Sequence, residues 1–220
     1  MNLTDLLIDE RAEHDRARRI DGVAVGIVTD NQDPERLGRV RVQFPWLASG
    51  SESAWAKVAA FMAGAERGAV FLPEVDDEVL VAFEQGDINY PYVIGALWNR
   101  QDPPPETNAD GSNNIRIIRS RNGHQLLFND DDRGGGRLEI RTGAGHQIIL
   151  DDNSGQEKIQ ILDKSGNNSI EFDSTQNSIN IQSMVTLKLK AQTIEIEAGA
   201  SMKLSASGVL EINGSLVKIN

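Results

Sequence analysis

The chain has 220 residues, enough for one large domain or two small ones with hydrophobic cores. Its 33 Asp and Glu residues against 22 Lys and Arg give a formal net charge of −11, which argues against nucleic acid as a partner because phosphate backbones are repelled. Since the chain contains no cysteine, a disulfide framework and a thiolate metal site are excluded.

The first 20 residues predict a short N-terminal helix. Asn2 or Thr4 can cap this helix. Its apolar stripe consists of Leu3, Leu6 and Leu7 and covers only the first two turns. Charged residues follow at once, which is not the pattern of a secretory signal, and no apolar run in the sequence approaches the roughly 20 residues of a membrane span. We therefore expect a protein made in the cytoplasm without a signal peptide.

Residues 21–99 predict a small closed β-barrel. Five strand candidates are separated by turns that contain Gly and Pro, and they lie at 22–29, 38–44, 55–60, 78–84 and 92–97. This number of strands in about 80 residues matches the size of a barrel such as an OB-fold. The acidic run Asp76, Asp77 and Glu78 could suggest a metal or acid–base cluster, but consecutive strand residues point to alternating faces. We interpret this run as a polar turn.

A linker is predicted at residues 100–114, where three consecutive prolines stand in a polar stretch. Proline lacks an amide donor and stiffens the chain into an extended path. We therefore expect four segments: a helical segment at 1–20, the barrel at 21–99, the linker at 100–114 and a repetitive segment at 115–220.

The segment 115–220 repeats a short unit in which two apolar residues flank a polar one. The pairs are Ile115/Ile117, Leu126/Phe128, Leu138/Ile140, Ile148/Leu150, Ile159/Ile161, Ile170/Phe172, Ile179/Ile181, Leu187/Leu189, Ile194/Ile196, Met202/Leu204, Leu210/Ile212 and Val217/Ile219. Gly, Ser, Asn and Asp stand between the pairs, as they do in turns. The pattern is typical of a β-solenoid-type repeat with one strand and one turn per unit, in which both apolar side chains of a strand point the same way.

A single narrow ribbon of such strands cannot cover two apolar side chains per strand. The missing partners must come from other chains or from a wide coil of the same chain. Three chains wound together would close a narrow prism, bury the apolar pairs and leave no long unpaired edge. The residues that we expect in the core of this trimer are Ile170, Phe172, Ile179, Ile181, Leu187, Leu189, Ile194, Ile196, Met202, Leu204, Leu210 and Ile212.

Two long motifs in the barrel segment resemble the family of VgrG proteins and phage baseplate assembly protein V. The first is GIVTDNQDPERLGRVRVQFPWL at residues 26–47, which resembles the opening of that family's OB-fold. The second is FLPEVDDEVLVAFEQGDINYPYVIGALWN at residues 71–99, which resembles its close. Together with the following repeat, the resemblance covers residues 21–220. It implies an all-β protein in which an OB-fold barrel precedes an intertwined trimeric β-helix needle.

The resemblance also implies a function, that of the central spike of a contractile injection system or a phage-like tail baseplate. Such a spike is a homotrimer that docks on a hub, pierces the target envelope with transient membrane contact, and is delivered outside on contraction. Only about 20 residues precede the barrel, so we expect the hub to be a separate protein that contacts Leu3, Leu6 and Leu7. Effector cargo is a further partner that the resemblance implies.

The end of the sequence resembles needles that are capped by a PAAR-repeat tip protein. The residues expected to bind this tip are Leu216, Val217, Lys218, Ile219 and Asn220. Some family members carry an inserted enzyme domain, for which the linker has no room, and others end in a His-x-His iron site, whereas no His follows His146. We therefore expect no enzyme activity, no catalytic or metal-binding residues and no cofactor.

Two other functional classes compete with the spike. A β-solenoid that binds polysaccharide, or an adhesive tail module, would need an aromatic row, but Phe128 and Phe172 are the only aromatic residues after residue 114. A cell-wall hydrolase would need a nucleophile, a base and an orienting group within hydrogen-bond reach, and nothing in the sequence marks such a set. His124 and His146 stand in the similar phrases NGHQLLF and GAGHQIIL, which we interpret as an internal repeat.

Overall fold

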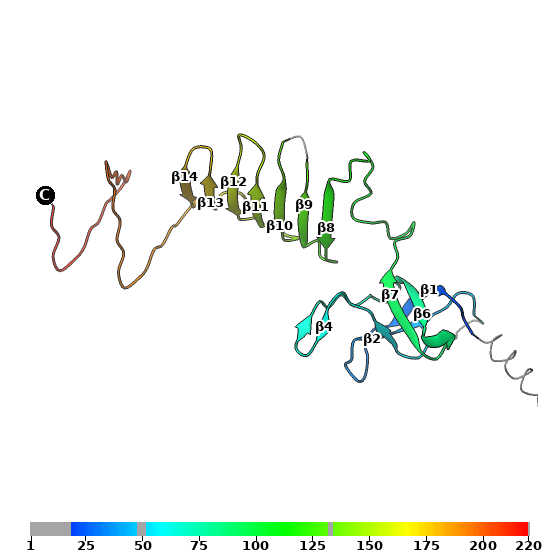
Figure 1. Ribbon diagram of the computed structural model, residues 1–220. Coiled ribbons are helices and arrows are strands. Elements are labelled where there is room, and N and C mark those ends of the chain that lie inside the picture. Colours follow the sequence, from blue (N-terminus) through cyan, green and yellow to red (C-terminus); the bar gives the residue numbers. More distant parts are fainter. Residues whose placement is uncertain (1–18, 48–51, 132–133, 220) are drawn as a thin grey trace, which may run out of the picture. The chain divides into compact units, whose positions relative to one another are not determined.

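The computed structural model of the chain describes residues 19–47, 52–131 and 134–219. The fold is all-β, as predicted, and forms two compact units, Met1–Gly111 and Ser112–Asn220 (Figure 1). The boundary between the units falls inside the stretch 100–114 that we expected to be a linker. The predicted N-terminal helix, with its hub-contact candidates Leu3, Leu6 and Leu7, lies outside the described residues.

The first unit contains a closed five-stranded barrel with the strand order β1-β2-β3-β7-β6. Its strands are β1 (Val23–Asp30), β2 (Arg39–Gln43), β3 (Ala56–Val58), β6 (Glu78–Phe83) and β7 (Pro91–Ala96). Neighbouring strands are antiparallel except β3 and β7, which are parallel. This barrel confirms the OB-like fold, and every predicted strand is found within two residues of its expected bounds.

Valines that alternate with outward-facing residues form the hydrophobic core of this barrel. In β2, Val40 and Val42 are fully buried and alternate with the half-buried Arg39, Arg41 and Gln43, and β6 repeats the pattern with Val79 and Val81. The buried core consists of Val28, Val40, Val42, Phe44, Ala56, Val79, Val81, Phe83 and Val93. β-Branched residues favour the strand conformation and pack well on a pleated surface, so propensity and burial agree here.

A small hairpin that the sequence did not predict stands between β3 and β6. It consists of β4 (Ala63–Gly64) and β5 (Arg67–Gly68), which pair only with each other. Strands of two residues rich in Ala and Gly leave no alternating pattern to detect. The 3-10 helix η1 (Glu84–Gly86) follows β6, and within the described residues no helix is long and apolar enough to cross a bilayer.

The second unit contains a seven-stranded antiparallel meander in which each strand pairs with the next along the chain. The strands are β8 (Ile115–Arg119), β9 (Gln125–Asn129), β10 (Arg137–Arg141), β11 (Gln147–Asp151), β12 (Lys158–Leu162), β13 (Ser169–Asp173) and β14 (Ser178–Gln182). Figure 1 shows them side by side in chain order. One short strand and one turn per unit is the arrangement that the repeat predicted.

The stretch 183–219 is described throughout but contains no strand. Its large apolar residues are exposed, from 47% for Val217 to 90% for Val185. The repeat predicted strands here as well, but a strand needs a neighbouring backbone to accept and donate its ladder hydrogen bonds. A single chain supplies no such neighbour for this stretch, so the predicted core residues within it, Leu187 to Ile212, remain a prediction.

We expect the barrel to be sensitive to a single methyl group at Gly26. A Cβ atom there would lie 2.2 Å from Cγ1 of the fully buried Val42. Gly26→Ala should therefore lower the free energy of unfolding by about 1–3 kcal/mol, the usual cost of overpacking. Tryptophan fluorescence in denaturant measures this directly, because all three tryptophans, Trp46, Trp55 and Trp98, lie in the first unit.

The matched control for that variant is Gly95→Ala in β7. No atom lies within 4 Å of a Cβ placed at Gly95, so this variant should unfold at nearly the same denaturant concentration as the unaltered chain. Equal stability of the two variants would contradict the packing of β1 against β2.

Candidate interaction surfaces

One face of the second sheet is apolar from β9 to β14, and in the edge strand β8 it carries Ile118 together with Arg116. The register places each apolar pair directly opposite the pair of the next strand, so their side chains form two rows across the sheet. The first row is Ile118, Leu126, Ile140, Ile148, Ile161, Ile170 and Ile181, and the second is Phe128, Leu138, Leu150, Ile159, Phe172 and Ile179. We call this surface the apolar face.

The part of the chain that the structure describes leaves the apolar face uncovered. The exposed fractions of its more accessible side chains run from 38% for Leu150 to 64% for Ile179. Contiguous apolar surface of this extent marks an interaction site in soluble proteins. The apolar face is therefore the strongest candidate site in the second unit.

The opposite face of the same sheet is held by polar contacts. Glu139, only 5% exposed, forms ion pairs with Arg137, at 2.8 Å, and with Arg141, both on its own strand. The Nε2 of Gln160 donates to the Oε2 of Glu171 at 2.7 Å across the β12–β13 pair. These polar groups have charged or amide partners within one chain, and the same face also carries Leu127 and the buried Ile149.

The first strand of the sheet corrects one detail of the predicted repeat. The sequence IRIIR contains three isoleucines, and the repeat pattern predicts Ile115 and Ile117 as the apolar pair. In the structure Ile118 pairs with Leu126 and Arg116 pairs with Phe128. Ile118 and Arg116 therefore lie on the apolar face. The predicted pair lies on the opposite face, because side chains alternate along a strand. Arg116 pairs its guanidinium with Asp130.

The structure brings four of the predicted trimer-core residues together on the apolar face: Ile170, Phe172, Ile179 and Ile181. The other eight lie in the stretch without strands. The predicted tip-binding residues Leu216, Val217, Lys218 and Ile219 are also exposed in that stretch, and Asn220 lies outside the described residues.

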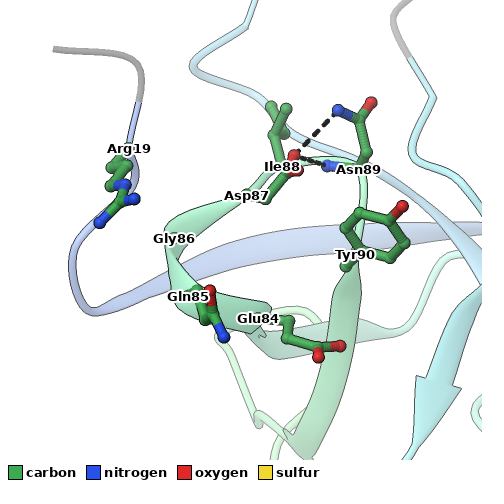
Figure 2. A pocket seen from close by; sticks show the side chains of 8 residues that line it. All are labelled: Arg19, Glu84, Gln85, Gly86, Asp87, Ile88, Asn89 and Tyr90. Atoms are coloured by element: carbon green, nitrogen blue, oxygen red, sulfur yellow. Dashed lines mark hydrogen bonds between the residues drawn. The ribbon is translucent and has the colours of Figure 1, made fainter. Parts of the chain in front are cut away.

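The barrel carries a polar cavity of about 730 Å³ beside the point where the chain enters β1. Figure 2 shows its lining, which consists of Arg19, Glu84, Gln85, Gly86, Asp87, Ile88, Asn89 and Tyr90. The entering chain is fixed to this loop because the backbone N–H of Ile20 donates to the carbonyl of Gly86 at 3.0 Å. The hydroxyl of Tyr92 donates to Glu84 at 2.6 Å, which raises the pKa of that tyrosine.

A second, apolar groove of about 610 Å³ lies along the β4–β5 hairpin. Phe61 and Val70 are 86% and 90% exposed there, and the rings of Phe61 and Phe71 lie 6.4 Å apart. A two-stranded hairpin is only marginally stable alone in water. This groove is a second exposed apolar surface, separate from the apolar face.

The two histidines that the sequence singled out lie in turns of the second sheet. The Nδ1 atoms of His124 and His146 each accept a backbone N–H, from Gly143 and Lys164 respectively, both at 3.2 Å. The described part of the chain contains no group of three or more His, Asp or Glu side chains placed to hold a metal ion. The acidic run at Asp76 belongs to the turn before β6, where the backbone N–H of Asp77 donates to the carbonyl of Glu74.

Carboxylates stabilise the turns of the second sheet by accepting hydrogen bonds. The Asn168 amide and the Ser165 hydroxyl donate to Asp163 at 2.9 and 2.8 Å, and they lower the pKa of that carboxyl to about 2. Asp173 receives the Thr175 hydroxyl at 2.6 Å, which likewise lowers its pKa. Both turns therefore depend on ionised carboxylates.

Comparison with known proteins shows which proteins the chain is similar to. Residues 24–98 match the type VI secretion system/phage-baseplate injector OB domain. The chain is 26% identical over 96% of its length to the actin cross-linking toxin VgrG1 of Vibrio cholerae. It is 33% identical over 53% of its length to the type VI secretion system spike protein VgrG4b of Pseudomonas aeruginosa, and 29% over 73% to VgrG5 of the same species. It spans only 18%, 17% and 19% of these three curated relatives.

The ionised state of Asp163 predicts a loss of stability in acid. Its pKa in the folded chain lies below the ordinary value of 3.8, so the stability it contributes is present above about pH 4 and is lost as the pH falls toward 2. Ser165→Ala removes one donor and should move this loss to higher pH. Denaturant titrations at a series of pH values, followed by circular dichroism, test it, and an unchanged acid profile would contradict the role of Asp163.

Proposed function

We infer the function from a family relationship: the chain is related to the VgrG spike proteins and the phage baseplate V proteins, and its barrel is an injector OB domain. We propose that it is the central spike of a contractile injection system or a phage-like tail baseplate. In this proposal three copies bring their apolar faces together around a threefold axis. The observation that carries it is the pair of apolar rows, one of which crosses all seven strands and the other β9 to β14, and which are exposed in the single chain.

The energy available from this contact is large enough to drive association. Burying a Leu, Ile or Phe side chain contributes roughly 1.5–3 kcal/mol, so the half-exposed side chains of one apolar face are worth on the order of 10 kcal/mol. Three faces together then yield about 30 kcal/mol, against a cost of roughly 4–15 kcal/mol for each association step. Two such steps assemble three chains at a total cost of roughly 8–30 kcal/mol, so burial of the three faces offsets the cost of association.

The shape of the apolar face favours three copies over two. Each strand contributes only two inward side chains, so the apolar face is narrow and long. Three narrow sheets close a triangular prism around such rows, whereas two sheets stacked face to face leave their long rims open to water. Three chains also supply strands to one another along 183–219, where each chain alone lacks ladder partners.

The proposed mechanism is mechanical. The apolar rows lie inside the prism and the ion-paired face lies outside, so axial load is shared by three hydrogen-bonded sheets. The proposal includes no catalytic step. It includes docking on a hub protein through Leu3, Leu6 and Leu7, a PAAR-repeat tip on Leu216–Asn220, carriage of effector cargo and delivery outside the cell on contraction. These partners are supported by the resemblance to spike proteins.

Neighbouring residues of β14 give a sharp test of the trimer. Ile181 lies on the apolar face and is 55% exposed in the single chain, while the exposed Asn180 lies on the opposite face. Ile181→Asp should weaken association at least tenfold, because a carboxylate without a partner is costly to bury. Asn180→Asp should associate like the unaltered chain. Sedimentation velocity over a concentration series makes the comparison, and equal association of both variants would contradict the proposed interface.

The spike function is tested in injection particles. Ending the chain after Gly111 removes the second unit and keeps the barrel. We expect particles with this chain to lose puncture of target cells while the truncated protein still folds, as tryptophan fluorescence would report. Particles that still puncture their targets at the normal rate would refute the piercing role.

A further inference from the structure

Three successive turns at one end of the second sheet are joined by the same hydrogen bond. Each turn ends in a residue whose side chain accepts a backbone N–H from the next turn. His124 Nδ1 accepts from Gly143 at 3.2 Å, and His146 Nδ1 accepts from Lys164 at 3.2 Å. The third acceptor is Asn168, whose Oδ1 takes the N–H of Met184, in the stretch that follows β14, at 3.1 Å and also the hydroxyl of Ser183 at 3.1 Å. We call His124, His146 and Asn168 the clasp residues, and they follow one another at intervals of 22 residues.

The turns hold the clasp residues in equivalent positions. In each turn the first side chain accepts the N–H of the clasp residue. These bonds run from His124 to Ser120 Oγ at 3.2 Å, from His146 to Thr142 Oγ1 at 3.1 Å and from Asn168 to Asp163 Oδ1 at 3.3 Å. The first residue of each turn also donates its own N–H to the carbonyl of the clasp residue. Each acceptor is therefore oriented by its own turn before it reaches the next one.

Close backbone packing surrounds the first clasp. A Cβ atom at Gly143 would lie 2.0 Å from the carbonyl oxygen of Asn122, so only glycine fits where the second turn meets the first. At the second clasp a Cβ at Gly145 would lie 3.6 Å from Cβ of Lys164, an ordinary contact. The clasp bonds thus join turns that already touch.

We propose that the three clasp residues play one structural role, and that acid opens the two histidine clasps while the asparagine clasp stays closed. An imidazole nitrogen accepts a hydrogen bond only when it carries no proton, and both nitrogens of a protonated ring are donors. Histidine changes its charge between about pH 5 and 8, whereas an amide does not titrate. The sheet therefore contains two acid-sensitive clasps and one built-in control.

Charged groups lie around both histidine clasps. His124 has Arg121 in its own turn, and Arg119 of β8 and Arg141 of β10 lie at the strand ends beside it. At His146 the flanking groups are Arg141, Asp163 and Lys164. Arg141 is itself ion-paired with Glu139, and Asp163 is engaged by Asn168 and Ser165. A protonated Nδ1 carries an N–H of its own and faces the backbone N–H donor, so the clasp bond is lost.

Amide exchange of the full chain, resolved by NMR, tests the proposal. After correction for intrinsic exchange rates, protection of the Gly143 and Lys164 amides should fall roughly five- to tenfold between about pH 7.5 and about pH 5, the size expected for one hydrogen bond. Protection of the Met184 amide should not change. Equal behaviour of all three amides across this range would overturn the acid-sensitive clasp.

Two variants of one residue separate the clasp from general folding. His146→Asn puts an asparagine, the residue type of the third clasp, at the position of the second clasp. The Lys164 amide should then stay protected at both pH values. His146→Ala should leave that amide unprotected at both. In either variant the Gly143 amide should keep its pH dependence, which shows that the sheet is folded. If the Asn and Ala variants protect Lys164 equally, the proposal is wrong, whatever the assembly state of the protein.

Discussion

The register of the second sheet is the constraint on which the rest of the structure depends. Side chains alternate along a strand, so a slip of one residue would move a whole row to the other face. The turns fix the register through repeated side-chain-to-backbone bonds, such as that from His146 to Thr142. As a result the apolar rows fall on one face and the ion pairs of Glu139 on the other. A sheet with these two faces is stable in water only when the apolar one is covered.

The two units meet this demand in different ways. The barrel closes on itself: β1 pairs with both β2 and β6, every barrel strand has two neighbours, and Val28 and Val81 are fully buried within one chain. The meander has free edges at β8 and β14 and an uncovered face. In our account other chains cover its apolar side chains and supply ladder partners to the strandless stretch 183–219. In our account the barrel supplies a self-sufficient domain and the meander supplies the assembly.

Sequence patterns predicted the elements whose stability is local. The alternating valines of β2 and β6 gave correct strand positions, and the repeat predicted one strand per turn through β14. The same reasoning missed β4 and β5, whose Ala and Gly residues carry no period. It assigned Ile115 and Ile117 to the wrong face, because three isoleucines in five residues fit either alternation and only pairing with β9 decides. The clasps join residues nearly twenty positions apart, so the repeated Gly-His-Gln phrase indicated similarity but not the bond.

The central claim is that the apolar face is an interface between copies of this chain. The most direct measurement is the mass of the unaltered protein in solution, by light scattering coupled to size exclusion. Our account predicts three copies of the 24.1 kDa chain, about 72 kDa, that persist on dilution. A monomer of 24.1 kDa that stays folded and soluble with its apolar rows exposed would contradict the account at its foundation.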